Sequence, residues 1–348
     1  MRVLVTGGAG FVGSHVVDQL LGAGHDVRVV DALDPSLHRE PPVFVDPRVE
    51  LVPGDIRNPN VAACVVDGVD AVSHQAAMVG LGVDFDDVTD YVDHNALATA
   101  VLLRALHRRD FRGRFVLASS MVVYGEGRYR CAVHGLIRPL PRTSLQLQRG
   151  DFEPACPGCG AALAPESVPE SAPIDPRNVY AATKLHQEHL CDAFARTHPD
   201  AAVTVLRYHN VYGPRMPRDT PYAGVASIFR SAIERGEAPR VFEDGGQLRD
   251  FVHVRDVARA NVLALTVEEP VRDVCNVASG TPRTVLDMAN ALAAAAPTRP
   301  TPVVVGSGRL GDVRHVFAST ARAYELLGFR AETDFAAGMR EFATAPLR

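Results

Sequence analysis

The 348-residue chain lacks the features that mark several large classes of protein. It contains no apolar run of the roughly 18 residues that a membrane span requires, so we expect no contact with a membrane. It has no polybasic run, and its net charge of −5 leaves no basic face for nucleic acid. The first apolar strand begins at Val3, which leaves no room for a signal peptide. We therefore expect a cytoplasmic protein.

Cysteine is scarce, with six residues in the chain. So few cysteines in a cytoplasmic protein do not indicate a disulfide framework. Three of them stand singly in apolar or helical surroundings, where we expect small core residues: Cys64, Cys191 and Cys275. The sequence also has no internal repeat and no low-complexity tail. These absences leave an ordinary α/β enzyme as the first expectation.

A glycine-rich turn near the N-terminus organises the rest of the sequence. The apolar run Val3–Val5 predicts a buried parallel strand, and a helical pattern follows the glycines at 7, 10 and 13. Gly7 suits a tight turn, Gly10 lets the backbone approach a pyrophosphate, and Gly13 lets the helix pack against the strand. The partial positive charge at the helix N-terminus then faces the phosphates. This stretch predicts a dinucleotide site.

The next strand indicates which dinucleotide is bound. The apolar run Val27–Val30 ends in Asp31, which lies 18 residues after Gly13. This is close to the offset of a carboxylate that accepts hydrogen bonds from the adenosine ribose. Because an acid at this position also repels a 2′-phosphate, we expect NAD rather than NADP.

Short apolar strands then alternate with amphipathic helices, which predicts a parallel sheet with crossover helices. Ligands bind beyond the carboxyl ends of such strands. Asp55 follows one strand and could accept a hydrogen bond from the adenine amino group, or it could cap the next helix. Asn95 is a candidate for fixing a loop near the cofactor. Ser119 and Ser120 end a later strand, in the right place for chemistry.

Tyr180 and Lys184 stand four residues apart in a helical segment, so both project from one helix face. A phenol with a reference pKa of ~10 is a poor base, but a neighbouring ammonium stabilises the phenolate. With the Ser120 hydroxyl nearby, these groups can take a proton from an alcohol while hydride leaves its carbon. The pattern predicts catalysis of this kind.

Several motifs in order resemble one family, the extended short-chain dehydrogenase/reductases, and within it the nucleotide-sugar epimerase/dehydratase group. The motifs are residues 6–13, Asp55-Ile56, residues 74–77, residues 119–125, Tyr180 with Lys184, residues 210–214, residues 249–254 and residues 309–312. The resemblance implies a Rossmann-type doubly wound parallel sheet with a smaller C-terminal substrate-binding domain. Residues 1–125 and 173–208, with a returning segment near 240–265, would bind NAD. Residues 209–239 and 266–348 would bind the nucleotide sugar.

The resemblance also implies a role for each motif residue. Tyr180 would be the base, Lys184 would hold the nicotinamide ribose, and Ser120 would hydrogen-bond the reacting hydroxyl. The implied cofactor contacts are Gly7, Gly10, Phe11, Val12, Gly13, Asp31, Asp55, Ile56, Ala76, Ala77, Asn95, Ser119, Tyr180, Lys184 and Tyr208. The implied substrate contacts are Ser120, Met121, Asn210, Arg249 and Arg309, with a surface ion pair as the alternative for each arginine. A homodimer is expected by analogy.

The residues after Ser120 indicate which reaction of this family the chain would catalyse. Relatives that dehydrate or decarboxylate carry acidic residues where this chain has Met121 and Val122, which cannot transfer protons. A 4-epimerase remains, with a 4-ketosugar reductase or dehydrogenase as the first alternative and a non-catalytic NAD-sensing protein as the second. A softer resemblance, which runs from residues 220–224 to residues 311–315, points to dTDP-L-rhamnose 4-epimerases. UDP-glucose, UDP-glucuronate and a deoxysugar of secondary metabolism remain open as substrates.

Residues 126–172 fall outside the resemblance and carry a metal-binding pattern. Cys131 and His134 are separated by two residues, as are Cys156 and Cys159, and 21 residues lie between the pairs. This spacing predicts a structural zinc ribbon, since four protein ligands leave no open position on the metal. A metal-free loop and a redox thiol pair are the alternatives. Because the insertion joins the Ser120 strand to the Tyr180 helix, we expect a lid or an interface element at the rim of the sugar pocket.

Overall fold

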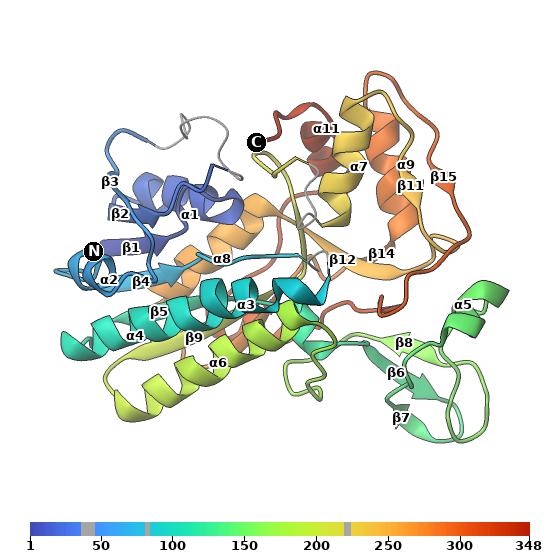
Figure 1. Ribbon diagram of the computed structural model, residues 1–348, viewed down its shortest axis with the longest axis horizontal. Coiled ribbons are helices and arrows are strands. Elements are labelled where there is room, and N and C mark those ends of the chain that lie inside the picture. Colours follow the sequence, from blue (N-terminus) through green and yellow to red (C-terminus); the bar gives the residue numbers. More distant parts are fainter. Residues whose placement is uncertain (36–45, 81–83, 219–223) are drawn as a thin grey trace.

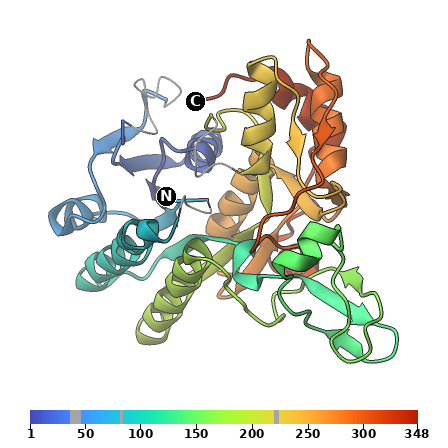
Figure 2. The ribbon, with the colours of Figure 1, turned by 45° about the vertical axis from the view of Figure 1, so that its right-hand side comes forward.

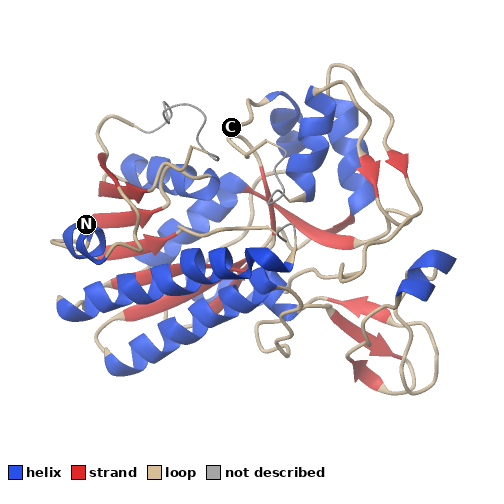
Figure 3. Cartoon of the chain, in the orientation of Figure 1, coloured by secondary structure: helices blue, strands red, loops and turns tan. Residues whose placement is uncertain are grey.

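The computed structural model describes residues 1–35, 46–80, 84–218 and 224–348. Its centre is a sheet of seven parallel strands in the order β13-β9-β5-β4-β1-β2-β3. Figure 3 shows helices on both sides of this sheet. The strands are β1 (Arg2–Thr6), β2 (Asp26–Asp31), β3 (Glu50–Pro53), β4 (Ala71–His74), β5 (Arg114–Ser120), β9 (Ala202–Tyr208) and β13 (Val274–Val277). The predicted doubly wound parallel sheet is confirmed.

Both faces of the sheet are buried, as the continuous apolar strands predicted. Along β1, Val3 and Val5 enter one core and Leu4 enters the other, and all three side chains are fully buried. The first core lies under α1 (Phe11–Gly22), α8 (Val254–Thr266) and α10 (Ala321–Leu327). The second lies under α2 (Pro59–Val65), α4 (Ala98–Arg108) and α6 (Val179–Thr197). The alternation of side chains along one strand therefore supplies both layers.

A smaller region with its own core lies beside the sheet (Figure 1). Its helices are α7 (Val225–Glu234), α9 (Val285–Ala295) and α11 (Phe335–Thr344). Its strands are β10 (Asn210–Tyr212), β11 (Arg240–Val241), β12 (Leu248–His253), β14 (Pro282–Thr284) and β15 (Val303–Val304). The last helix of the chain is α11, which follows α10 in the sequence. Asp334 caps α11, and Met339 and Phe342 bury its inner face.

The insertion forms a separate antiparallel sheet in the order β7-β6-β8, which projects beside the smaller region (Figure 2). Its elements are β6 (Arg128–Cys131), β7 (Gly135–Ile137), α5 (Ser144–Arg149) and β8 (Ala164–Glu166). Its core is small, with Tyr129 and Leu163 packed against Cys131 and Cys156. Four short helical segments complete the described elements: η1 (Phe85–Asp87), α3 (Val88–Tyr91), η2 (Val92–Leu97) and η3 (Met121–Tyr124).

Two of the three isolated cysteines are buried as expected, namely Cys191 and Cys275. Cys64 is exposed on α2, so its expected place in the core was wrong. The inner face of α2 is instead formed by Ala62 and Val65. Among the described helices, none is long and apolar enough to cross a membrane.

Candidate functional site

The loop between β1 and α1 has the geometry of a dinucleotide-binding turn. Gly7 has a φ of +65°, and a Cβ atom on it would lie 2.8 Å from the backbone of Ala76. A Cβ on Gly13 would lie 2.1 Å from the carbonyl oxygen of Gly7, and one on Gly10 would lie 2.9 Å from it. Only glycine fits these positions. The backbone therefore remains open to a pyrophosphate at the start of α1, where Phe11 and Val12 form the first turn.

Two acids follow neighbouring strands near this loop. The Asp31 carboxylate accepts hydrogen bonds from the amides of Ala9 at 3.0 Å and Leu33 at 2.9 Å, so β2 places it directly beside the glycine-rich turn. Asp55 pairs with Arg57 at 2.6 Å, and this hydrogen bond lowers the pKa of the Asp55 carboxyl. The alternative that Asp55 caps α2 is wrong, because Asn58 caps that helix.

The loop after β4 is tied to the sheet and to α6. The amide of Ala76 donates to the Thr6 hydroxyl at 3.1 Å. Asn95 accepts from the amide of Met78 at 2.8 Å, and its own amide donates to the Met78 carbonyl and the Thr183 hydroxyl, both at 3.0 Å. Ala77 lies within this fixed loop and Ile56 is buried in the second core.

The phenol of Tyr208 is buried and contacts both α8 and Gln75, the first residue of this loop. It hydrogen-bonds to Asn261 at 3.0 Å and to Gln75 at 3.2 Å, and Tyr208 is only 8% exposed. Burial raises its pKa, so the phenol stays neutral and serves as an internal hydrogen-bonding group. Its expected contact with the cofactor stays a prediction.

The fold brings Ser120, Tyr180 and Lys184 together where β5 ends beside α6. The Lys184 ammonium lies 5.9 Å from the centre of the Tyr180 ring and donates to the carbonyl of Ala118 at 3.0 Å. Burial raises the pKa of Tyr180 to about 12, while a hydrogen bond with Ser120 acts in the opposite direction. Burial also lowers the pKa of Lys184 to about 7. Asn178 caps α6 at its start, which fixes the helix that carries both groups.

A buried polar network lies one helical turn beyond Lys184, and the sequence reasoning missed it. Arg207 donates to the two carboxylate oxygens of Glu188 at 3.0 and 2.7 Å and to the Tyr124 hydroxyl at 2.9 Å. The Ser119 hydroxyl donates to the same carboxylate at 2.5 Å, so this hydroxyl is occupied by a hydrogen bond within the protein. The side chains of Glu188 and Arg207 are 7% and 6% exposed. The helical spacing from Tyr180 to Lys184 to Glu188 was the signal that could have revealed it.

The expected substrate residues lie in different environments. Asn210 has a buried side-chain oxygen without a hydrogen-bond partner among the described residues. Arg249 donates to the carbonyls of Val313 at 2.7 Å and Arg314 at 2.9 Å, so a surface ion pair was the wrong alternative for it. Met121 opens η3 directly after Ser120.

Arg309 is exposed, and its guanidinium lies 4.0 Å from the centre of the Phe242 ring. Across the described parts of the chain, no carboxylate forms an ion pair with it. The alternative that Arg309 forms a surface ion pair is therefore wrong for the described residues. The stretch 220–223, part of the softer resemblance, lies outside the described residues.

The four predicted metal ligands meet at one end of the insertion. Their ligand atoms all lie within 4.8 Å of one another. The sulfur of Cys131 is 3.7 Å from that of Cys159 and 3.6 Å from Nδ1 of His134, which is 3.4 Å from the sulfur of Cys156. Hydrogen bonds from the backbone amides of His134 and Val133 lower the pKa of Cys131 to about 6, which favours the thiolate.

Comparison with known proteins identifies the family. Residues 3–139 and 157–278 match the model of the NAD-dependent epimerase/dehydratase family. The chain is 30% identical over 348 residues to the dTDP-L-rhamnose 4-epimerase of Burkholderia thailandensis, covering 99% of this chain and 94% of that protein. The chain therefore belongs to the NAD-dependent epimerase/dehydratase family, as the motifs predicted. Within residues 3–278 the family match leaves out residues 140–156, a shorter stretch than the expected 126–172, and it ends before residues 279–348.

Solved structures have the same fold over the whole length. The UDP-glucose 4-epimerase of Thermotoga maritima, solved with UDP-glucose, superposes with a TM-score of 0.80 at 28% identity, covering 99% of this chain and 97% of that chain. The UDP-glucose 4-epimerase of Thermus thermophilus, solved with NAD, gives a TM-score of 0.78 at 29% identity, covering 99% and 98%.

Proposed function

We propose that this chain is an NAD-dependent nucleotide-sugar 4-epimerase. The observation that carries the proposal is the meeting of Ser120, Tyr180 and Lys184 at the carboxyl end of β5, in the same parallel sheet whose strand β1 runs into the glycine-rich turn. The turn fits NAD because its three glycines leave the backbone bare, and because Asp31 stands at the adjacent strand end where a ribose is expected. Bound NAD would accept hydride from C4 of the sugar and return it.

Each residue of the trio has a chemical task in this scheme. Tyr180 takes the proton of the C4 hydroxyl, and Ser120 orients that hydroxyl by a hydrogen bond. Lys184 stabilises the phenolate form of Tyr180, and each unit of pKa decrease corresponds to ~1.4 kcal/mol of differential interaction. The 4-keto sugar then turns in the pocket, and Tyr180 returns its proton after hydride arrives on the opposite face. Met121 and Val122 offer no acid or base for a dehydration or decarboxylation.

We infer a dTDP-6-deoxyhexose of the L-rhamnose type as the first substrate to test, with UDP-glucose and UDP-glucuronate next. The support is the 30% identity with the dTDP-L-rhamnose 4-epimerase over nearly the whole chain. The structural relatives at 28% and 29% identity are UDP-glucose 4-epimerases. The proposed diphosphate contacts are Asn210 and Arg309, and the support for Arg309 is an exposed guanidinium that forms no ion pair among the described residues.

The test is incubation of the purified protein with each nucleotide sugar without added NADH, following the C4 configuration by NMR. Conversion of one sugar to its 4-epimer at constant NAD redox state is the expected result. Reduction of a 4-keto sugar that consumes added cofactor would replace the epimerase with a reductase. Bound NAD with no turnover of any sugar would favour the non-catalytic NAD-sensing protein.

A variant pair checks the role of the phenol. Tyr180→Phe should lower kcat by about 10²–10⁴-fold, the range of general acid–base catalysis, with NAD still bound. Tyr324→Phe is the control, because Tyr324 is 50% exposed on α10. Equal activity of the two variants would remove Tyr180 from the scheme.

We also propose that Cys131, His134, Cys156 and Cys159 bind a structural zinc ion. Bonds of about 2.3 Å to sulfur and about 2.0–2.1 Å to nitrogen place tetrahedral ligand atoms about 3.8 Å apart for two sulfurs and about 3.6 Å apart for sulfur and nitrogen. The distances of 3.7, 3.6 and 3.4 Å lie close to these values. Metal analysis should find one zinc per chain, and Cys156→Ser with Cys159→Ser should abolish it. Cys64→Ser, at an exposed cysteine outside the cluster, should keep it.

A homodimer is the expected assembly. Two exposed apolar side chains, Val92 at 43% and Leu97 at 46%, lie on η2, which packs beside α6 at the surface of the sheet domain. Light scattering should give twice the 37.4 kDa chain mass, and Leu97→Glu should shift the protein toward the monomer. A monomeric parent protein would exclude this assembly.

A further inference from the structure

We propose that the metal-binding insertion is a fixed wall of the substrate cleft, and that Arg142 is the positioning residue that joins this wall to the nucleotide-binding side. The proposal rests on the nucleotide-sugar function proposed above. A cleft of about 660 Å³ lies between the insertion and residues 309–312. This volume is in the range of small-molecule sites. Arg138, Leu140 and Arg142 line one side of the cleft, while Arg309 and Asp312 line the other.

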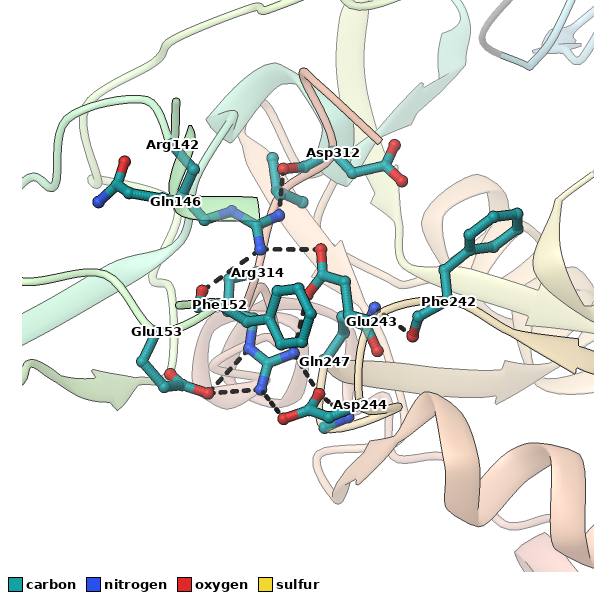
Figure 4. Close-up of polar contacts among 12 residues, drawn as sticks. Arg142, Gln146, Phe152, Glu153, Phe242, Glu243, Asp244, Gln247, Asp312 and Arg314 are labelled. Atoms are coloured by element: carbon teal, nitrogen blue, oxygen red, sulfur yellow. Dashed lines mark hydrogen bonds and ion pairs between the residues drawn. The ribbon is translucent and has the colours of Figure 1, made fainter. Parts of the chain in front are cut away.

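Arg142 connects the two sides through a buried guanidinium. Its side chain is 4% exposed and comes from the loop before α5. The guanidinium donates to a carboxylate oxygen of Glu243 at 2.8 Å and to the carbonyl oxygens of Asp312 at 2.7 Å and Phe152 at 3.3 Å (Figure 4). Its partners thus lie in the insertion, in the loop after β11 and in the segment that carries Arg309. One side chain fixes three separate pieces of chain.

A second arginine lies next to it and extends the junction. Arg314 is 2% exposed and donates to Glu153 at 2.8 Å, to Glu243 at 2.8 Å and to Asp244 at 2.7 Å (Figure 4). Two buried guanidinium groups thus face three carboxylates, of which Glu243 is shared. Glu243 is buried, while Glu153 and Asp244 are about half exposed. Removing Glu243 would leave buried charge without compensation, so the junction has one favoured arrangement. The insertion is held as a wall rather than as a free lid.

The segment that Arg142 holds has few other ties. Arg309 and Leu310 are exposed, and among the described residues the amide of Asp312 donates to the Arg309 carbonyl alone, at 3.3 Å. Arg249 holds the carbonyls of Val313 and Arg314, which follow this segment. Glu243 follows Phe242, the ring under the Arg309 guanidinium. Arg142 therefore holds the Asp312 carbonyl on one side of the Arg309–Phe242 contact and the side chain of Glu243, the residue after Phe242, on the other. Loss of its hydrogen bonds should loosen the position of Arg309, and with it the binding of the diphosphate.

The metal cluster is linked to the same junction through a short segment. Phe152 and Glu153 precede Cys156, whose amide donates to the Ala161 carbonyl at 2.8 Å within the turn that carries Cys159. The Arg314 guanidinium lies 5.7 Å from the centre of the Phe152 ring. A metal ion at the cluster would hold this segment from one end while the two arginines hold it from the other. The insertion thus has a structural reason to be rigid.

The test compares Arg142→Met with Arg130→Met. Arg130 lies on β6 of the same insertion, is about half exposed and pairs with Glu166, so its loss removes a similar side chain outside the junction. Arg142→Met should raise the KM for the nucleotide sugar at least tenfold and change kcat by less than threefold. It should weaken binding of dTDP or UDP in calorimetry to a similar extent, with zinc and NAD contents unchanged. Arg142→Lys should recover part of the loss, because it restores the charge beside Glu243.

A fall in kcat with unchanged KM and unchanged nucleotide affinity would overturn the proposal, as would equal behaviour of the two methionine variants. If Arg142→Met does not fold, Glu153→Gln tests the same junction, with Glu166→Gln as its control. The expected result is again weaker nucleotide binding for Glu153→Gln alone. Failure of the proposed epimerase would appear separately, as no turnover by the parent protein, since nucleotide binding is measured without turnover.

Discussion

The carboxylate of Glu188 and the guanidinium of Arg207 form a bidentate pair at 3.0 and 2.7 Å, buried directly behind the Ser120–Tyr180–Lys184 trio. Glu188 lies four residues after Lys184 on α6, and its charge raises the pKa of Lys184 against the larger effect of burial. Lys184 is the only lysine in the chain. The pair therefore acts on the one ammonium group that the proposed chemistry requires.

Replacement of Glu188 by glutamine should shift the pH dependence of the reaction. Loss of the negative charge lowers the pKa of Lys184 further, so the ammonium is lost at lower pH as the pH rises. The alkaline fall in kcat should therefore move to lower pH. Stability should also decrease by about 3–5 kcal/mol, because Arg207 keeps only a neutral acceptor in a buried site. A pH–rate profile and urea unfolding measure the two effects.

The control for this variant is Glu325→Gln, at an exposed position on α10. It should leave the pH–rate profile and the urea midpoint unchanged. If the alkaline fall in kcat of Glu188→Gln stays at the same pH as in the parent protein, the charge of Lys184 does not limit the rate.

Much of the fold could be read from local patterns. The apolar strands and glycine positions predicted the sheet, because burial on both faces produces continuous apolar runs and a tight turn accepts only glycine. Spacing alone predicted that Asp31 lies beside the glycine-rich turn and that Tyr180 and Lys184 share one helix face, and the structure has both arrangements. These features depend on residues close together in the sequence, so the sequence displays them directly.

The junction around Arg142 could not be predicted in this way. Arg142 meets Glu243 and Asp312, which lie 101 and 170 residues further along the chain. Nothing near Arg142 in the sequence distinguishes it from exposed arginines such as Arg138 and Arg149. The ion pair of Arg207 with Glu188 could not be predicted for the same reason, because it forms only where β9 packs beside α6. Long-range ion pairs leave no local pattern.

Two glycines of α1 should behave in opposite ways when changed to alanine. A Cβ on Gly13 would lie 2.1 Å from the Gly7 carbonyl oxygen, so Gly13→Ala must push the helix away from the glycine-rich turn. We expect loss of bound NAD and a clear fall in melting temperature. Gly22→Ala, near the other end of the same helix, has no atom within 4 Å of the added Cβ. It should keep NAD and be neutral or more stable by up to about 1 kcal/mol.

Two measurements compare the variants: the amount of NAD released on denaturation, and the melting temperature in thermal unfolding. Retention of NAD by Gly13→Ala would mean that the turn tolerates a shift of about 1 Å, and the close packing would not be required for binding.

Metal removal should unfold the insertion and leave the large sheet intact. The insertion core contains few residues, and two of its buried members are the ligands Cys131 and Cys156. Such a small core gives little stability without metal. Hydrogen exchange of chelator-treated protein should therefore lose protection in residues 128–166, while β1, β4 and β5 stay protected. Unchanged protection of β6 and β8 would show that the metal is not what holds them.

The ionisation of Lys184 should appear as a pH dependence of stability in the cofactor-free protein. Burial lowers the pKa of Lys184 to about 7, whereas an unfolded chain has a lysine pKa of ~10.4. Between these values the unfolded chain binds a proton that the folded chain does not, so the free energy of unfolding rises with pH. The gain from pH 7.5 to 9.5 should be about 2–3 kcal/mol, and it is lost as the pH falls toward 7. Lys184→Met removes this gain, so the difference between parent and variant in urea unfolding isolates it. Because Lys184 is the only lysine, a single NMR signal from lysine labelled at Cε reports its pKa directly, and a value near 10 would contradict the prediction.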